Sequence, residues 1–464
     1  MGGAGEGAYA RRPVQRFVVL LLVAGVLAVV GLGLSAPRST GPAPLTSAAS
    51  PTPGAVQETP ASAVVETKLT PPTAPAAVVS AAPPPAPSAD VSSRPEPAAR
   101  SSQQLPLPTA NPPAVSAPPA PMPAFDAAMN AVLAEGYPGG SLAVVRDGKL
   151  VYTRGYGFAK AGVAATPMTR YRQASVSKAV TGSLLAQLVT NGTLTMDLRV
   201  FPYLGVAPVD PRTNAITVRM LKDHTSGFAG DYFLFESRKA ATFYGVASPP
   251  DPDTMVRWTA HYQLATDPGS TYHYNNTNYA ILSRVIEKAT GRAWIDLVRD
   301  MAKPFGIATW RLGTSLARPA DEATYYEADT FKFGPSVFDS VPGTVETPYG
   351  AYDAASLNGA VALVSTVIDM ARYDQGVAMG GIPAPELDAI PTKAGWSYTY
   401  VYNGSMPGQY TFVMRVWDGA HLTVMAGAFN HRDAGAIDET INGRILDAHR
   451  ATTAWPAVDL FPNY

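Results

Sequence analysis

A serine and a lysine three positions apart have the types and spacing that covalent catalysis needs. They are Ser175 and Lys178, in the phrase R-Q-A-S-V-S-K-A-V. Apolar residues recur at four-residue spacing after the serine, which predicts a helix over Ser175–Val189 with the two side chains one turn apart. A serine hydroxyl needs a base within hydrogen-bonding reach, and a desolvated lysine can serve. We therefore expect Ser175 to be a nucleophile beside the positive end of a helix dipole.

Two later phrases carry further polar residues in a fixed order along the chain. P-G-S-T-Y-H-Y-N-N-T-N-Y contains Tyr274 and Asn276, and Y-N-G-S-M-P-G contains Tyr402 and Gly404. The chain thus has three motifs in order: S-x-x-K, Y-x-N and a third motif that contains glycine. This order resembles that of the serine β-lactamase, DD-peptidase and esterase superfamily, and the Y-x-N form is similar to that of its class C branch. The phrases PGGSLAVVRDGKLVYTRGYG and LKDHTSGF agree, so the resemblance covers residues 124–464.

The resemblance implies a role for each matching residue. Ser175 would attack the acyl carbon, while Lys178 and Tyr274 would share the proton transfers as the other two catalytic residues. Asn276 would hold the lysine and the substrate amide. The oxyanion would lie between the backbone N–H groups of Ser175 and Ser405.

The third motif departs from the family pattern, because Tyr402 stands before Gly404 where a lysine or histidine is usual. We expect Tyr402, Gly404 and Ser405 to contact substrate, but a neutral tyrosine makes no charge-assisted contact with a carboxylate. Arg415 is a candidate replacement, although strand alternation can direct it away. Without a cation there, we expect the pKa of Tyr274 to stay near its ordinary value of about 10, leaving more of the base role to lysine.

Strand patterns at both ends of residues 124–464 enclose a mainly helical region. An Asp147-Gly148 turn predicts a hairpin between Ser141–Arg146 and Lys149–Arg154. The pattern predicts an α+β fold, in which one antiparallel sheet built from both chain ends packs against helices and a helical subdomain. The other expected strands are 397–403, Tyr410–Trp417 and His421–Phe429, and the other expected helices are Asn278–Ala289, Gly359–Tyr373 and Ala434–Arg450.

The N-terminal part has the composition of a delivery segment. A basic segment, 1–16, precedes an unbroken apolar run, 17–34, which as a helix would span about 27 Å, close to the thickness of a bilayer core. We favour an uncleaved signal anchor over a cleaved signal peptide. The positive-inside rule then places the catalytic domain outside the cytoplasmic membrane, and cleavage would make the protein secreted. Residues 35–123 are rich in Pro, Ala and Ser, which predicts a disordered linker.

Composition excludes several classes of function. The net charge of -1 provides no basic surplus for nucleic acid. The chain has no cysteine, and its six histidines lack metal-ligand spacing, so we expect no metal and no cofactor. We expect His224, in LKDHTSGF, to be structural and to pin loop backbone.

The leading hypothesis is an exported, esterase-like serine hydrolase that acts on small-molecule or peptide esters and amides. Alternatives with the same chemistry are a DD-peptidase, a D-aminopeptidase or a β-lactamase that acts on cell-wall peptides or β-lactams, with peptidoglycan as a partner beside the membrane. A different class is a sensor or scaffold that is acylated on Ser175 without turnover.

Overall fold

The computed structural model describes residues 121–327, 331–376, 398–432 and 436–464. The expected membrane segment, 17–34, and all but the end of the expected linker lie outside these ranges. Within them, every helix is too short or too polar to span a bilayer.

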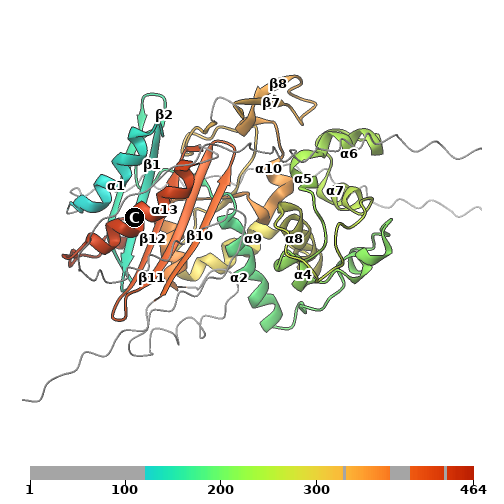
Figure 1. The fold of residues 1–464 in the computed structure, drawn as a ribbon, viewed down its shortest axis with the longest axis horizontal. Coiled ribbons are helices and arrows are strands. Elements are labelled where there is room, and N and C mark those ends of the chain that lie inside the picture. The colour runs from blue at the N-terminus through green and yellow to red at the C-terminus, as the bar shows by residue number, and fades with distance from the viewer. Residues whose placement is uncertain (1–120, 328–330, 377–397, 433–435) are drawn as a thin grey trace, which may run out of the picture. The chain divides into compact units, whose positions relative to one another are not determined.

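The central feature is a six-stranded sheet that combines both ends of the domain (Figure 1), in the order β10-β11-β12-β1-β2-β3. Both residues of the Asp147-Gly148 turn have positive φ, as a two-residue hairpin with this twist requires. Strand β1 pairs antiparallel with β2 on one side and with β12 on the other. These pairings confirm the predicted α+β fold. The strands are β1 (Gly139–Arg146), β2 (Lys149–Lys160), β3 (Val163–Ala164), β10 (Tyr398–Met406), β11 (Gln409–Trp417) and β12 (Leu422–Phe429).

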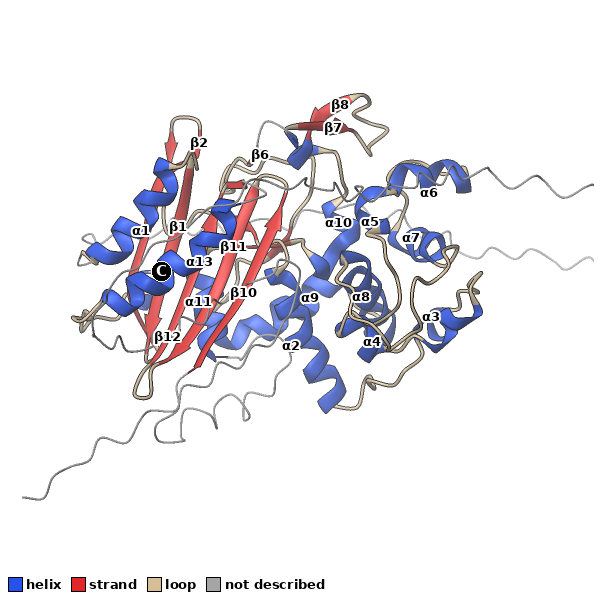
Figure 2. Ribbon diagram, in the orientation of Figure 1, coloured by secondary structure: helices blue, strands red, loops and turns tan. Residues whose placement is uncertain are grey.

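Each face of the sheet is covered by helices. Helices α1 (Pro123–Ala134) and α13 (Ala436–Ala451) lie across one face, in front of the strands in Figure 2. The other face packs against α2 (Val176–Thr190) and α11 (Val367–Gly376). Alternate residues of each strand therefore enter separate apolar clusters, as the strand period of two requires.

The helical region lies beside the sheet in Figure 2 and supplies the second wall of the site. Its helices are α3 (Val200–Leu204), α4 (Val218–Lys222), α5 (Tyr232–Phe235), α6 (Ser237–Tyr244), α7 (Pro252–Thr259), α8 (Asn276–Thr290), α9 (Trp294–Ala302) and α10 (Ala354–Leu357). The short strands are β4 (Tyr171–Arg172), β5 (Arg311–Leu312), β6 (Tyr326–Glu327), β7 (Phe333–Pro335), β8 (Thr344–Glu346), β9 (Leu363–Ser365) and β13 (His431–Arg432). The 3₁₀ helices are η1 (Pro211–Ala215), η2 (Lys303–Phe305), η4 (Thr347–Tyr349), η5 (Asn358–Ala360) and η6 (Phe461–Asn463).

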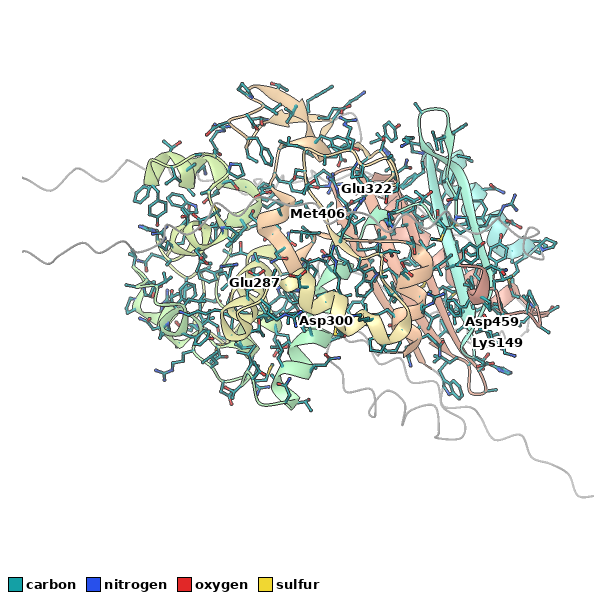
Figure 3. The ribbon with its side chains drawn as sticks, turned by 180° about the vertical axis from the view of Figure 1, so that it is seen from behind. Lys149, Glu287, Asp300, Glu322, Met406 and Asp459 are labelled. Atoms are coloured by element: carbon teal, nitrogen blue, oxygen red, sulfur yellow. The ribbon has the colours of Figure 1, made fainter. Side chains whose placement is uncertain are left out.

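The C-terminal tail closes one end of the sheet. Lys149 and Asp459, both labelled in Figure 3, lie beside one another there. The backbone N–H of Leu150 donates to Asp459 Oδ1 at 3.2 Å, and the N–H of Leu460 donates to the carbonyl of Leu150 at 2.8 Å. The tail thus fixes the start of β2.

The predicted helix over Gly359–Tyr373 is wrong in its first half. The chain there forms η5 and then strand β9, which pairs with β4 and β5, and helix α11 begins at Val367. A short buried strand and a buried helical turn give the same apolar run, so the periodicity could not separate them. Helix α1, at the start of the domain, was not predicted.

Candidate active site

The first wall of the site is the loop that leads into α2. Ser175 is the N-cap of this helix, but its side chain makes no capping bond, so the hydroxyl remains available for other partners. The loop is held in place at Gln173, whose N–H donates to Leu363 O at 2.7 Å and whose carbonyl accepts from Thr411 Oγ1 at 2.8 Å. Ala174 has a φ of 44°, a strained value for a residue with a Cβ, and it turns the chain sharply just before the serine.

The Ser175 hydroxyl lies between two groups that can exchange protons with it. Its Oγ is 2.7 Å from Tyr274 Oη and 3.1 Å from Lys178 Nζ. The lysine amine also donates to Asn276 Oδ1 at 2.7 Å and to Ala360 O at 2.9 Å. The structure therefore brings together Ser175, Lys178, Tyr274 and Asn276.

Burial changes the proton affinity of the lysine. Lys178 is 1% exposed, and this burial lowers its pKa to about 7, while the negative charge of Asp231 acts in the opposite direction. A large fraction of the amine is therefore neutral near pH 7, as a general base requires.

The pKa of Tyr274 is shifted in the opposite direction to that of Lys178. Burial of its phenol raises the pKa, and the hydrogen bond with Ser175 lowers it by less. The expectation that this pKa stays near its ordinary value is therefore wrong, because the phenol is buried; the His224 ring lies 4.5 Å away between centroids. Tyr274 is a neutral phenol that can donate and relay a proton.

The LKDHTSGF loop and the start of α8 hold each other in register, which positions Tyr274 and Asn276. Asn275 caps α8 by accepting from the N–H of Asn278 at 3.0 Å, and its Nδ2 donates to Phe228 O at 2.9 Å. Asn278 Oδ1 accepts from Ser226 Oγ at 2.7 Å, and its Nδ2 lies 3.2 Å from His224 Nδ1. Burial lowers the pKa of His224 to about 3, so the imidazole is neutral. These contacts fit the structural role expected for this histidine.

Sequence reasoning missed two partners of this cluster. Asp231 accepts hydrogen bonds from the backbone N–H of Asn276 and, at 2.9 Å, from Asn276 Nδ2. The carbonyl of Ala360 accepts from Lys178. A single loop aspartate has no periodic signal, although its position four residues after Gly227 in the T-S-G phrase could have marked it, and a backbone carbonyl has no sequence signature.

The third motif brings strand β10 against the nucleophile. A Cβ built on Gly404 would lie 2.7 Å from both Gln173 O and Ser175 N, and 3.0 Å from Ala174 Cβ. Only glycine allows this approach of two backbones. The next residue, Ser405, is partly exposed on the same edge strand, so the structure places Gly404 and Ser405 beside Ser175.

Tyr402 enters the buried side of the site. It is 3% exposed, and burial raises its pKa well above the ordinary value, with smaller contributions from Tyr279 and Asp374. Arg415, the candidate substitute cation, is also buried: Nη1 donates to Asp374 O at 2.5 Å and lies 3.9 Å from Asp374 Oδ2. The guanidinium therefore binds helix α11.

The chemistry available here is that of the side chains themselves. In the described part of the chain, no three histidine, aspartate or glutamate side chains gather in an arrangement that could hold a metal ion. The site combines the hydroxyl of Ser175, the buried amine of Lys178 and the neutral phenol of Tyr274 with two closely approaching backbone segments. This set of groups is suited to acyl transfer.

Comparison with known proteins gives matches over the same region. The Beta-lactamase family model matches residues 125–434. Penicillin-binding protein 4 of Amycolatopsis lactamdurans is 35% identical over 182 residues, which cover 37% of this chain and 43% of that protein. A D-aminopeptidase of Brucella anthropi is 35% identical over 207 residues, which cover 43% of this chain and 38% of that protein. The chain thus spans less than half the length of these two curated relatives.

A solved structure shares the fold. The D-amino acid amidase from Ochrobactrum anthropi SV3, complexed with L-phenylalanine amide, aligns with a TM-score of 0.54 and 19% identity, covering 71% of this chain and 99% of that chain. The family match extends over well more than half of the sequence and includes all the motif residues. The chain belongs to the β-lactamase family and is similar in sequence to a penicillin-binding protein and to D-aminopeptidases.

Proposed function

We propose that the protein hydrolyses esters or amides through an acyl-enzyme on Ser175. The observation that supports this most strongly is the position of Ser175 Oγ, 3.1 Å from a buried lysine amine and 2.7 Å from a phenol. A neutral amine has two N–H groups and one lone pair. Asn276 Oδ1 and Ala360 O can only accept, so they take both N–H groups, and the lone pair remains for the Ser175 proton.

Each proton then has a defined place in the acylation step. Ser175 Oγ forms a bond to the carbonyl carbon as its proton passes to Lys178, directly or through Tyr274. The oxyanion is stabilised by backbone N–H groups of Ser175 and Ser405. The C–O or C–N bond breaks when the leaving group receives that proton from Lys178 or Tyr274. Water then attacks the acyl-enzyme with the same two groups, releasing the acid and free Ser175.

The substrate is an ester or amide without a carboxylate beside the scissile bond. Tyr402 replaces the usual cation, and Arg415 donates to Asp374, so neither of these two described residues offers a charge-assisted contact to a substrate carboxylate. D-amino acid amides and short peptides are the second candidate, supported by relatives that include a D-aminopeptidase and a D-amino acid amidase.

We further propose that the hydrolase acts outside the cytoplasmic membrane and is held there by residues 17–34. The support is the arginine cluster ahead of this apolar run. Protease added to intact spheroplasts should release the catalytic domain. Protection of the domain until lysis would place it in the cytoplasm.

Labelling with a fluorophosphonate tests the nucleophile. Intact-mass spectrometry of the full-length chain should show one adduct, and Ser175→Ala should show none. Ser177→Ala is the matched control, because Ser177 lies on the same helix but its hydroxyl accepts from Leu363 N at 3.1 Å. The Ser177→Ala control should still be labelled. An adduct on Ser175→Ala would mean that another residue is the nucleophile.

A substrate panel then separates the candidate activities. Nitrophenyl esters of short acids, D-amino acid nitroanilides, nitrocefin and D-Ala-D-Ala peptides should be compared by kcat/KM. A higher kcat/KM for the esters or amides than for nitrocefin would support the proposal. Labelling without turnover of any substrate would favour the acylated sensor.

A further inference from the structure

We propose that Asp231 is a positioning residue for the hydrolysis proposed above, because it fixes which end of the Asn276 amide faces Lys178. The inference rests on the proposed function and concerns a residue outside the three motifs. Asp231 precedes α5 as its N-cap, yet its side chain makes no capping bond to that helix. The carboxylate instead turns toward the first residue of α8.

Both carboxylate oxygens are used on one residue. Asp231 Oδ1 accepts from the backbone N–H of Asn276, and Oδ2 accepts from Asn276 Nδ2 at 2.9 Å. An ionised carboxylate can only accept hydrogen bonds, so it holds the amide with its NH₂ toward Asp231 and its oxygen toward Lys178. Asn276 Oδ1 then lies 2.7 Å from Lys178 Nζ.

The orientation of this amide matters for catalysis. If the side-chain amide of Asn276 were flipped, its NH₂ would face Lys178 and would donate to the lone pair of the neutral amine. That bond would compete with the Ser175 proton for the same lone pair. Asp231 therefore keeps Lys178 available as a base, without touching the substrate.

The charge of Asp231 also reaches Lys178, whose pKa it raises against the effect of burial. Among the residues that the structure describes, the other titratable groups that face the amine are Tyr274 and Tyr279, whose ring centroids lie 5.0 and 5.8 Å from Nζ, and the neutral imidazole of His224.

Within the described ranges, burial and the charge of Asp231 are the two effects that shift the pKa of the amine. Tyr402 of β10 lies next to Tyr279 as a neutral phenol, and α9 and β11 meet α2 through uncharged residues such as Trp294 and Val413. Removal of the carboxylate should therefore lower the pKa of Lys178 further.

The test is the pH dependence of fluorophosphonate labelling on the full-length chain, purified in mild detergent. In Asp231→Asn the maximal labelling rate should fall about 10- to 100-fold, the effect of losing one charge-assisted hydrogen bond. The midpoint of the acidic limb should move about 0.5 to 1 pH unit lower, for a partly exposed charge a few ångströms away. Asp231→Glu should retain the wild-type midpoint, since it keeps the charge, and recover part of the rate.

Asp197→Asn is the matched control, because it removes a carboxylate that is 84% exposed and pairs with Arg219 at 3.5 Å. It should change neither rate nor midpoint. Asp231→Asn with a lower melting temperature but a wild-type rate and midpoint would reduce Asp231 to a structural residue and overturn the inference. If Asp231→Asn does not fold, Asp231→Ser, which keeps a smaller acceptor, gives the same comparison. A wild type that is not labelled on Ser175 would instead overturn the proposed function.

Discussion

Replacing Gly404 by alanine tests whether the approach of β10 to the nucleophile loop is needed for catalysis. The added Cβ would lie 2.7 Å from Gln173 O and Ser175 N, and 3.0 Å from Ala174 Cβ. These are backbone and short side-chain atoms that cannot rotate away, so the strand must move outward by several tenths of an ångström. We expect overpacking to cost about 1–3 kcal/mol of stability. Displacing one oxyanion donor should lower kcat about 10²- to 10³-fold.

The assay is steady-state hydrolysis of a nitrophenyl ester together with urea unfolding. Gly443→Ala is the matched control, because its Cβ would meet no atom within 4 Å on helix α13. An alanine there should leave kcat unchanged and stabilise the helix by about 0.5–1 kcal/mol. If Gly404→Ala kept the wild-type kcat and stability, the contact between β10 and the Ser175 loop would not be the constraint inferred here.

Three further predictions concern protonation and charge. Because burial lowers the pKa of Lys178 to about 7, the acylation rate should rise with pH through about 7 as the amine loses its proton. The variant Lys178→Met should lower the acylation rate about 10²- to 10⁴-fold across that range. A rate that stays constant between pH 5 and 9 would contradict this prediction. Tyr402→Lys should shift the ratio of ester to nitrocefin turnover about 10- to 100-fold toward nitrocefin; efficient nitrocefin turnover by wild type, with no change in the variant, would mean that another cation is present. Burial lowers the pKa of His224 to about 3, below the value of 6.5 that the imidazole has in the unfolded chain, so the unfolded chain binds more protons below pH 6.5. The stability that the neutral His224 contributes is therefore complete above pH 6.5 and is lost as the pH falls below it. Its share of the unfolding free energy should fall by about 2 kcal/mol from pH 7 to 5, and His224→Asn should show a smaller decrease in urea unfolding.

The sequence predicted the fold class and the cluster of motif residues because each motif begins or lines an element with a readable pattern. Ser175 stands at the start of an amphipathic run, Tyr274 and Asn276 precede a second one, and Gly404 lies in an alternating strand near the chain end. Family order then indicates that these elements meet. Their catalytic roles remain predictions.

What the sequence could not predict is how the site residues are held. Asp231 acts through the orientation of an amide, and Ala360 through a backbone carbonyl, neither of which depends on a repeating pattern. The carbonyl of Ala360 faces Lys178 because the chain leaves η5 for a strand, which the periodicity placed inside a helix. The pKa of Tyr274 was misjudged because burial, rather than a neighbouring cation, determines it.

The pairing of β1 with β12 has a consequence for how the protein is made. Ala143 pairs with Ala426, so the first strand of the six-stranded sheet and the last one along the chain are neighbours. A chain that emerges from the ribosome from its N-terminus can pair β1 with β2 early, but the other edge of β1 has to wait for β12 until synthesis is almost complete. The segment that carries Ser175 is translated long before β10, so the contact between Gly404 and the Ser175 loop also forms late. The six-stranded sheet can therefore close only after its C-terminal strands have been made.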